Sequence, residues 1–541
     1  MRPVIAGTGP VSAACPTARE GGTVRWLQAA WCRPDLALVA AWVALFYSLF
    51  LFQGYQKLFR DSDAGWHIRS GETMLAAGSL PRTDPYSFTA AGRPWFAWEW
   101  ASDLVTGAIH RLAGLSGVAM LYALAIGAGV WLWFRLHWSV GGDFLLAAAL
   151  SPLLLSTCNI HWLARPHVFG WLFLLAALCY AERDHGAFRA RDAALIAMVS
   201  ALWANVHASF FLGPGIALLY ASAFFLRPLV WDLDRRPEWL RARWFVMAAA
   251  VSSLAGLLNP YGWGLHVHVF RYLTDSALLS RIGEFQSFDF HAAGSAQIVA
   301  CMLVAVAGGA LALAERRPQH FLLSMLVAAA ALRSARVLPL VALLLLPLAN
   351  AAFTEWLHAA PGLSKGVRRA IDRFLTYSGN LRRLDSRGSG WAIAWTVPAL
   401  CWALLETPAI AAHTGFPPDQ FPVAAYPEVA KLPAAARLFA PDKFGGYLIY
   451  RSRGARKVFF DGRSDLYGAE FLRRYGRMVQ VRPGWQESWK SFGFTHALLP
   501  NDYSLVAVLR AAGWRPLYRD GTATLLQAPA PASPAMGGGT K

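Results

Sequence analysis

The stretch LALVAAWVALFYSLFLF at residues 36–52 decides the fold, because an uncharged apolar segment of this length can cross the hydrocarbon core of a bilayer as a helix. Comparable apolar stretches recur along the chain as far as residue 409. Of the 541 residues, 56% are hydrophobic and only 15% are charged, whereas a soluble domain carries about 25% charged residues. The sequence therefore predicts an α-helical polytopic membrane protein.

These stretches predict about eleven transmembrane helices, which form a transmembrane domain over residues 36–409. The helices are expected near residues 36–54, 116–135, 144–160, 167–182, 193–206, 209–226, 244–258, 296–314, 320–335, 337–353 and 391–409. A segment at residues 1–35 precedes them, and the composition of residues 528–541 predicts a disordered tail.

The positive charges predict the orientation of the chain, whose formal net charge is +18. When residues 1–35 are placed in the cytoplasm, the basic groups at 135, 183–191, 227–243, 316–317 and 365–387 all fall on the cytoplasmic side, as the positive-inside rule requires. The residues after 409 then lie outside. Because the basic residues are scattered between apolar segments, no nucleic-acid partner is expected.

The tail at residues 410–527 has the composition of a soluble domain. Short strands are predicted at 447–450, 457–460, 496–500, 516–518 and 522–526, with helices at 468–479 and 504–512. Strands that alternate with helices predict a small, mostly parallel α/β domain. The tail contains no cysteine after Cys401, so it is expected to fold without disulfides.

The first outer loop, at residues 55–115, is too long to be a simple connection and carries a pair of carboxylates. In an extended segment, the spacing of Asp61 and Asp63 puts both side chains on one face, where they can divide base and orienting roles or share a divalent metal ion. A solvated loop or a helix N-cap is the alternative. His67 and Glu99 lie in the same loop and are candidates to position a ligand.

Other outer turns also contribute polar side chains, and polar groups at membrane depth tend to mark a site or a pathway. The candidate binding residues there are Arg165, His167, Asn205, His207, Arg333 and Arg336. Arginines at outer helix ends run against the positive-inside rule, and a phosphate bound by guanidinium groups would explain them. The alternative for the arginines is ion pairing with loop carboxylates or lipid head groups. The alternative for Asn205 and His207 is hydrogen bonding between helices. Glu284 could be a second acid, although a glutamate in a loop is usually solvated, and Asp461-Gly462-Arg463 with Asp465 is interpreted as a turn.

In these features the chain resembles the GT-C superfamily of membrane glycosyltransferases, and more closely a group of bacterial proteins of that type. The matching residues are Asp61-Ser62-Asp63 within DSDAGWH, 81–87 (PRTDPYS), Trp95 with Glu99-Trp100, Arg165-Pro166-His167, Asn205-Val206-His207, Gly446-Tyr447-Leu448 and 461–467 (DGRSDLY). The resemblance implies that an aspartate of the first loop, carried onto Asp61 or Asp63, is the catalytic base or a metal ligand. The Asp-Glu pair of protein O-mannosyltransferases and the WWDxG signature of oligosaccharyltransferases are absent.

The resemblance further implies transfer of a sugar from a polyprenyl-phosphate-linked donor to a glycan, lipid or protein acceptor, at the periplasmic face of a bacterial inner membrane. Asp61 or Asp63 would deprotonate the acceptor, and Arg333 and Arg336, with Arg165, would stabilise the leaving phosphate. Three alternatives remain: a ligase or polymerase of lipid-linked glycans, a transporter, and a non-catalytic assembly subunit.

Overall fold

The computed structural model describes residues 30–359 and 362–529, and each of the eleven predicted spans falls on a helix. These helices are α1 (Leu36–Leu49), α4 (Trp100–Ser139), α5 (Phe144–Cys158), α6 (His167–Ala181), α7 (Ala190–Val206), α8 (Leu212–Val230), α9 (Arg235–Ala255), α12 (Ser295–Ala314), α13 (Pro318–Arg333), α14 (Leu338–Leu340) with α15 (Leu346–Ala359), and α17 (Thr396–Leu405). Within the described ranges, 6 helices are long and apolar enough to cross a membrane. The multi-pass class is therefore confirmed, while the count of eleven stays a prediction. The expected segment 1–35 mostly, and the expected tail 528–541 almost entirely, lie outside the described residues.

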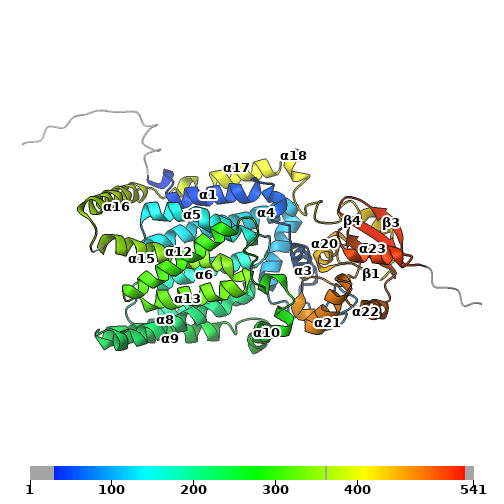
Figure 1. Cartoon of the computed structure of the whole chain (residues 1–541), viewed down its shortest axis with the longest axis horizontal. Helices are drawn as coiled ribbons and strands as arrows, with labels where there is room; N and C mark the ends of the chain where they lie inside the picture. Colours follow the sequence, from blue (N-terminus) through cyan, green and yellow to red (C-terminus); the bar gives the residue numbers. More distant parts are fainter. Residues whose placement is uncertain (1–29, 360–361, 530–541) are drawn as a thin grey trace, which may run out of the picture.

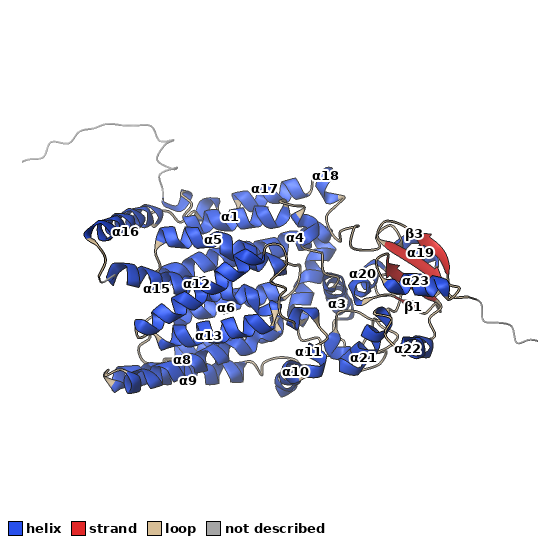
Figure 2. Cartoon of the chain, viewed as in Figure 1, coloured by secondary structure: helices blue, strands red, loops and turns tan. Residues whose placement is uncertain are grey.

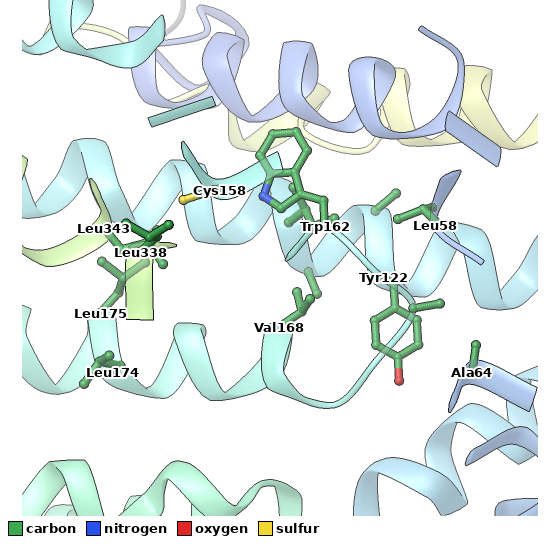
Figure 3. Packing of buried hydrophobic residues seen from close by; sticks show 14 of the residues in the cluster. Leu58, Ala64, Tyr122, Cys158, Trp162, Val168, Leu174, Leu175, Leu338 and Leu343 are labelled. Atoms are coloured by element: carbon green, nitrogen blue, oxygen red, sulfur yellow. The ribbon is translucent and has the colours of Figure 1, made fainter. Parts of the chain in front are cut away.

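The membrane helices pack around a buried apolar core that joins α4, α5, α6 and α14 (Figure 3). Trp162 and Tyr122 are both part of this core, with 4% and 0% of their surfaces exposed. Helices also approach closely where residues are small: a Cβ on Gly308 of α12 would lie 2.2 Å from the Cβ of Ala349 on α15. Small residues at such contacts are what membrane helices use to pack.

The first outer loop folds into helices that lie between the membrane helices and the C-terminal domain (Figure 1). It contains α2 (Gly54–Lys57) and α3 (Asp63–Ala77), and its last part is the first section of α4. Gly114, at φ +58°, breaks α4 there, because only glycine adopts this conformation readily. A second outer segment adds α10 (Trp263–Thr274) and α11 (Ser276–Leu279).

The C-terminal domain contains a four-stranded sheet with the order β1-β2-β4-β3, drawn in red in Figure 2. The strands are β1 (Leu438–Phe439), β2 (His496–Pro500), β3 (Arg515–Arg519) and β4 (Ala523–Gln527). β1 pairs with β2 in parallel, but β2–β4 and β4–β3 are antiparallel, so the prediction of a mostly parallel sheet is wrong. The helices are α19 (Tyr426–Lys431), α20 (Asp442–Arg451), α21 (Ser464–Val479), α22 (Trp485–Phe492) and α23 (Ser504–Ala511), while α18 (Pro408–Ala411) follows α17 at the membrane helices.

Two predicted strands of this domain are also corrected. Residues 447–450 lie inside α20, and residues 457–460 form no named strand, only an isolated bridge between Val458 and Ser87 of the first outer loop. The physical reason is tertiary packing, which overrides strand propensity here. A Cβ on Gly446 of α20 would lie 2.1 Å from the carbonyl oxygen of Ser62, so α20 packs directly against the start of α3.

The C-terminal domain shares its core with the outer part of the membrane domain. Ala90 and Leu278, from the two outer segments, belong to the same buried cluster as Phe459 and Trp489. The hydroxyl of Thr89 also donates a hydrogen bond to the carbonyl of Phe459 at 2.6 Å. The proposed boundary at residue 410 therefore does not separate two independent cores.

Candidate functional site

Two adjoining cavities lie at the ends of the membrane helices that face the C-terminal domain, which are the ends predicted to be outside. The first, here called the inner cavity, has a volume of about 250 Å³ and reaches between α6, α8, α10 and α14. The second, the outer cleft, has a volume of about 1430 Å³ and extends to α20 and α21 of the C-terminal domain. The residues that line both are Asp63, His161, Arg165, Tyr272, Glu284, Arg336, Gly462 and Ser464.

Asp61 and Asp63 lie at the N-terminal end of α3 and share one cation, which is Arg165. Asp61 Oδ2 is 2.7 Å from Arg165 Nη1, and Asp63 Oδ2 is 3.0 Å from Arg165 Nη2. Asp61 Oδ1 also accepts a hydrogen bond from the backbone N–H of Asp63 at 2.9 Å, so it caps the start of the helix as well. The cap orients the pair, and the guanidinium holds both carboxylates at the boundary between the two cavities.

Glu284 extends this cluster across the site. Its Oε1 lies 2.6 Å from Arg165 Nη1, and its Oε2 lies 2.9 Å from Arg336 Nη1. Arg165 and Arg336 thus form ion pairs with a loop carboxylate, which was one of the two alternatives considered from the sequence. Both guanidinium groups line both cavities.

Glu99 lies on the wall of the inner cavity between two histidines. Its Oε1 is 3.3 Å from His207 Nε2, and its Oε2 is 3.8 Å from His67 Nε2. The opposite nitrogen of His67, Nδ1, lies 2.6 Å from Asp103 Oδ1. His67 is buried and lines neither cavity, so it positions the two carboxylates beside it without facing a ligand.

Burial sets the ionisation of the carboxyl groups at the site. Together with the charge of a neighbouring carboxylate, it raises the pKa of Asp63 to about 7. Burial likewise raises the pKa of Glu99 to about 7. For Glu284 burial acts in the same direction, but the charges of Arg165 and Arg336 hold its pKa well below the usual range. Two groups that titrate near neutral pH therefore line the inner cavity.

The predicted metal role of Asp61 and Asp63 does not fit this arrangement. The position between the two carboxylates is taken by Arg165, which a divalent ion would have to replace. Across residues 30–359 and 362–529, no group of three or more His, Cys, Asp or Glu side chains is placed to hold a metal ion. Arg165 supplies the positive charge that the pair requires.

Five of the predicted binding residues line the inner cavity: Glu99, Arg165, His167, His207 and Arg336. His167 is oriented there by a hydrogen bond from its Nε2 to the carbonyl of His161 at 2.7 Å. Four outer turns of the chain, distant in sequence, are thus brought together around one small volume.

Asn205 and Arg333 are not part of this cluster. The side chain of Asn205 accepts a hydrogen bond from Trp100 Nε1 at 2.8 Å and donates one to the carbonyl of Leu258, so it links helices. Arg333 is exposed at the end of α13 and lines neither cavity. The close spacing of Arg333 and Arg336 suggested a joint role, but only Arg336 lines the cavities.

Sequence reasoning missed several residues of the site. Glu284 was interpreted as solvated, Asp461-Gly462-Arg463 and Asp465 as an ordinary turn, and Asp103 was not considered. The signal for Glu284 was a long outer loop facing unpaired outer arginines, which demand a counter-ion. For residues 461–465, nothing in the local pattern distinguishes a surface turn from one that the membrane domain buries.

Comparisons with known proteins agree with this geometry at the level of the fold. No family model and no curated protein matches the sequence. Among solved structures, the Archaeoglobus fulgidus oligosaccharyltransferase tethered with an acceptor peptide is 12% identical, with a TM-score of 0.51, over 86% of this chain and 68% of that chain. The AglB oligosaccharyltransferase of the same organism, in complex with an inhibitory peptide and a dolichol-phosphate, gives 12% identity and a TM-score of 0.50 over 86% and 69%. ArnT from Cupriavidus metallidurans bound to undecaprenyl phosphate gives 17% identity and a TM-score of 0.46 over 93% and 98%. The likeness to the two oligosaccharyltransferase structures shows that this chain shares their fold.

Proposed function

We propose that the protein is an inverting glycosyltransferase, which moves a sugar from a polyprenyl-phosphate donor to an acceptor at the periplasmic face of a bacterial inner membrane. The observation that carries this proposal is the position of Asp63 and Arg165 on the boundary shared by the inner cavity and the outer cleft. A base and a phosphate-binding cation must flank the same reacting carbon. A donor in the inner cavity and an acceptor in the outer cleft would meet at this boundary.

The walls of the inner cavity suit a lipid phosphate. Trp171, Leu174 and Leu340 form an apolar side facing the membrane helices, where the first isoprene units would pack. Arg165 and Arg336 lie on the polar side, and guanidinium groups bind phosphate oxygens through charge-assisted hydrogen bonds. This arrangement supports the assignment of the inner cavity to the donor.

The carboxylates at the start of α3 supply the base. Asp61 or Asp63 takes the proton of the acceptor hydroxyl, whose oxygen then attacks the anomeric carbon of the donor. The bond from that carbon to the phosphate oxygen breaks, and the polyprenyl phosphate leaves with the electron pair. Arg165 and Arg336 stabilise the negative charge that develops on the phosphate. Attack opposite the leaving group inverts the anomeric configuration.

The charge of the outer cleft favours an acceptor that carries negative charge. The cationic residues lining the cleft are Arg60, Arg165, Arg281, Arg336, Lys443, Arg473, Arg477 and Arg482, and the acidic ones are Asp61, Asp63, Glu284 and Asp442. An excess of cations attracts anionic ligands and raises their local concentration. A glycan or lipid acceptor bearing phosphate or carboxylate groups fits this surface better than a neutral one.

The ionisable residues of the site bear on the transporter alternative. A transporter is expected to place its ionisable residues near the middle of the bilayer. Asp63, Glu99 and Glu284 instead lie at the outer ends of the helices, beside a cleft that opens toward the C-terminal domain. This placement favours chemistry at the outer leaflet over passage across the membrane.

The test is turnover by the purified full-length chain in lipid nanodiscs. Release of free polyprenyl phosphate would be measured with a panel of radiolabelled polyprenyl-phosphate sugars and bacterial membrane extract as the acceptor source. Asp63→Asn should lower turnover by roughly 10²–10⁴-fold, which is the usual contribution of a general base, while donor binding is kept. Asp184→Asn is the matched control, because that side chain is 93% exposed and distant from the site. Full turnover in Asp61→Asn/Asp63→Asn would leave a non-catalytic subunit as the better interpretation.

A further inference from the structure

Residues 461–465 of the C-terminal domain form part of the wall of the inner cavity, although they are far from the membrane helices in sequence. Gly462, Arg463, Ser464 and Asp465 all line it. This segment connects the end of 457–460 to α21, and it lies between the first outer loop and α10. The C-terminal domain therefore supplies part of the wall of the inner cavity.

Gly462 brings this segment into contact with the proposed base. A Cβ at this position would lie 1.8 Å from Asp63 Oδ1, so any side chain would have to displace the carboxylate or the loop. Such an approach is open to glycine alone. The backbone of residue 462 therefore lies in direct contact with the carboxylate of the proposed base.

Arg463 fixes the segment to the first outer loop. Its Nη2 lies 2.8 Å from Asp84 Oδ1 and 2.7 Å from Asp461 Oδ2, and only 2% of the residue is exposed. The guanidinium also lies 4.8 Å from the ring centre of Trp95. A buried cation with two carboxylate partners is costly to separate, so the segment has one well-defined position.

Asp465 presents a carboxylate on this wall. Its Oδ2 is 3.1 Å from His268 Nε2, and its side chain is 9% exposed. Among the described residues, its Oδ1 has no hydrogen-bond partner. His268 is itself held by stacking on Phe96, with ring centres 4.4 Å apart. The free oxygen of Asp465 is thus a fixed acceptor at the inner cavity.

The rest of the cavity offers what a sugar ring needs. Trp66, Trp95 and Trp98 line it and provide apolar faces for the C–H groups of a pyranose, while carboxylates accept hydrogen bonds from its hydroxyl groups. At about 250 Å³ the cavity is below the roughly 300–1,000 Å³ of drug-sized pockets, so it suits one head group and not an extended glycan.

We propose that Asp465, held by His268, accepts hydrogen bonds from hydroxyl groups of the donor's sugar and thereby determines which sugar the protein transfers. This inference rests on the proposed function, because it places the donor in the inner cavity. It assigns sugar selection to the C-terminal domain, and acceptor binding to the cleft beyond it.

The experiment compares the binding of two kinds of lipid to the full-length chain in nanodiscs. Binding is measured by the change in tryptophan fluorescence. The probes are sugar-free polyprenyl phosphate and the polyprenyl phosphates of glucose, mannose and galactose. Asp465→Asn should weaken binding of the preferred sugar-bearing lipid by roughly 10–100-fold, the range for a hydrogen bond to a charged group, and leave the sugar-free lipid unchanged. Asp465→Glu moves the carboxylate without removing it, and should change the order of preference among the sugars. Glu487→Gln, on the exposed face of α22, is the control.

The outcomes separate this inference from the function on which it rests. Unchanged binding of the sugar-bearing lipids by Asp465→Asn, or equal weakening of sugar-bearing and sugar-free lipid, overturns the sugar subsite while the transferase proposal stands. Failure of the wild-type chain to bind any of these lipids overturns the donor class, and the subsite with it. Retained binding of sugar-free lipid by the variant shows that it is folded.

Discussion

At the scale of single residues, Glu284 competes with the proposed donor for the same two arginines. It binds Arg165 at 2.6 Å and Arg336 at 2.9 Å, so a phosphate that enters the inner cavity must share or replace these contacts. Removing the charge should free Arg336 for the ligand. Glu284→Gln is therefore expected to bind sugar-free polyprenyl phosphate more tightly, by roughly 5–20-fold for the loss of one competing ion pair.

This prediction is checked by fluorescence titration in nanodiscs at low and at physiological salt. The gain should be larger at low salt, because screening weakens exposed charges most. Glu487→Gln removes the same charge far from the site and should leave affinity unchanged. Weaker binding by Glu284→Gln would mean that the glutamate holds Arg165 and Arg336 in place for the phosphate.

The pH dependence of turnover follows from the raised pKa of Asp63, which is about 7. A carboxyl group is ionised above its pKa, and only the ionised form can accept the proton of the acceptor. Turnover should therefore rise with pH, roughly tenfold between pH 6 and pH 8. Initial rates in a mixed buffer would measure this, with donor binding followed at each pH.

Glu99 has a pKa in the same range, so the two groups must be separated by substitution. Glu99→Gln should keep the rise in turnover, whereas the residual turnover of Asp63→Asn should lose it. A rise that persists in Asp63→Asn and disappears in Glu99→Gln would assign the base to Glu99.

At the scale of elements, the contact of α3 with α20 depends on glycine. A Cβ on Gly446 would lie 2.1 Å from the carbonyl oxygen of Ser62, and one on Gly65 would lie 2.2 Å from that of Gly446. Gly446→Ala must push the helices apart, which should destabilise the outer part of the protein by about 1–3 kcal/mol. Thermal unfolding in detergent would show a lower midpoint.

Gly476→Ala on α21 is the matched control, because a Cβ there meets no atom within 4 Å. A helical glycine with free space should become equally or slightly more stable as alanine, by up to about 1 kcal/mol. Equal midpoints for the two variants would show that α3 and α20 can separate without cost.

The elements also show what the sequence could predict. Apolar length locates each membrane helix, because the bilayer demands it of every spanning segment, and α1 and α12 end within a few residues of the expected positions. The residues at 447–450 were misinterpreted because their strand-like composition comes from burial on both sides of α20.

For the site, outer polar residues such as Arg165 and His207 could be found from the sequence, because a polar side chain at membrane depth is energetically costly. The role of Asp465 at the cavity could not be predicted in this way, since its environment is created by α10, nearly two hundred residues earlier in the chain.

At the scale of the whole molecule, the orientation in the membrane can be tested directly. The basic helix α16 (Lys365–Asp385) lies at the end of the molecule opposite the C-terminal sheet (Figure 1). Reporter tags near Arg236 or Arg369 should therefore indicate the cytoplasm, and tags after Ile410 the periplasm. If a tag after Ile410 on an intact protein reported the cytoplasm, both cavities would lie on the cytoplasmic side, and their assignment to the outer face would be wrong.

The C-terminal domain should depend on the membrane domain for its stability. Residues 410–527 alone would lack Ala90 and Leu278 from their apolar cluster, and the buried Arg463 would lose Asp84. The isolated segment is expected to show weakened tertiary structure, with hydrogen exchange faster than in the full chain around β2. Reducing agent should make no difference. A cooperatively folded fragment with slow exchange would establish the boundary at 410 as that of an independent domain.

The pairing of the first outer loop with residues 458–463 has a consequence for how the protein is made. The hydrogen bond between Thr89 and Phe459 joins residues 370 positions apart in the chain. At a synthesis rate of about 5–20 residues per second, the loop reaches the far side of the membrane roughly 20–70 s before its partner exists. During this interval Asp84 and the apolar residues near Ala90 would stand exposed to the chaperones and proteases on that side of the membrane. A chain that stops before residue 458 would insert all its predicted membrane helices. It would still be a target for chaperones and proteases, because its first exported loop would lack the residues against which it packs.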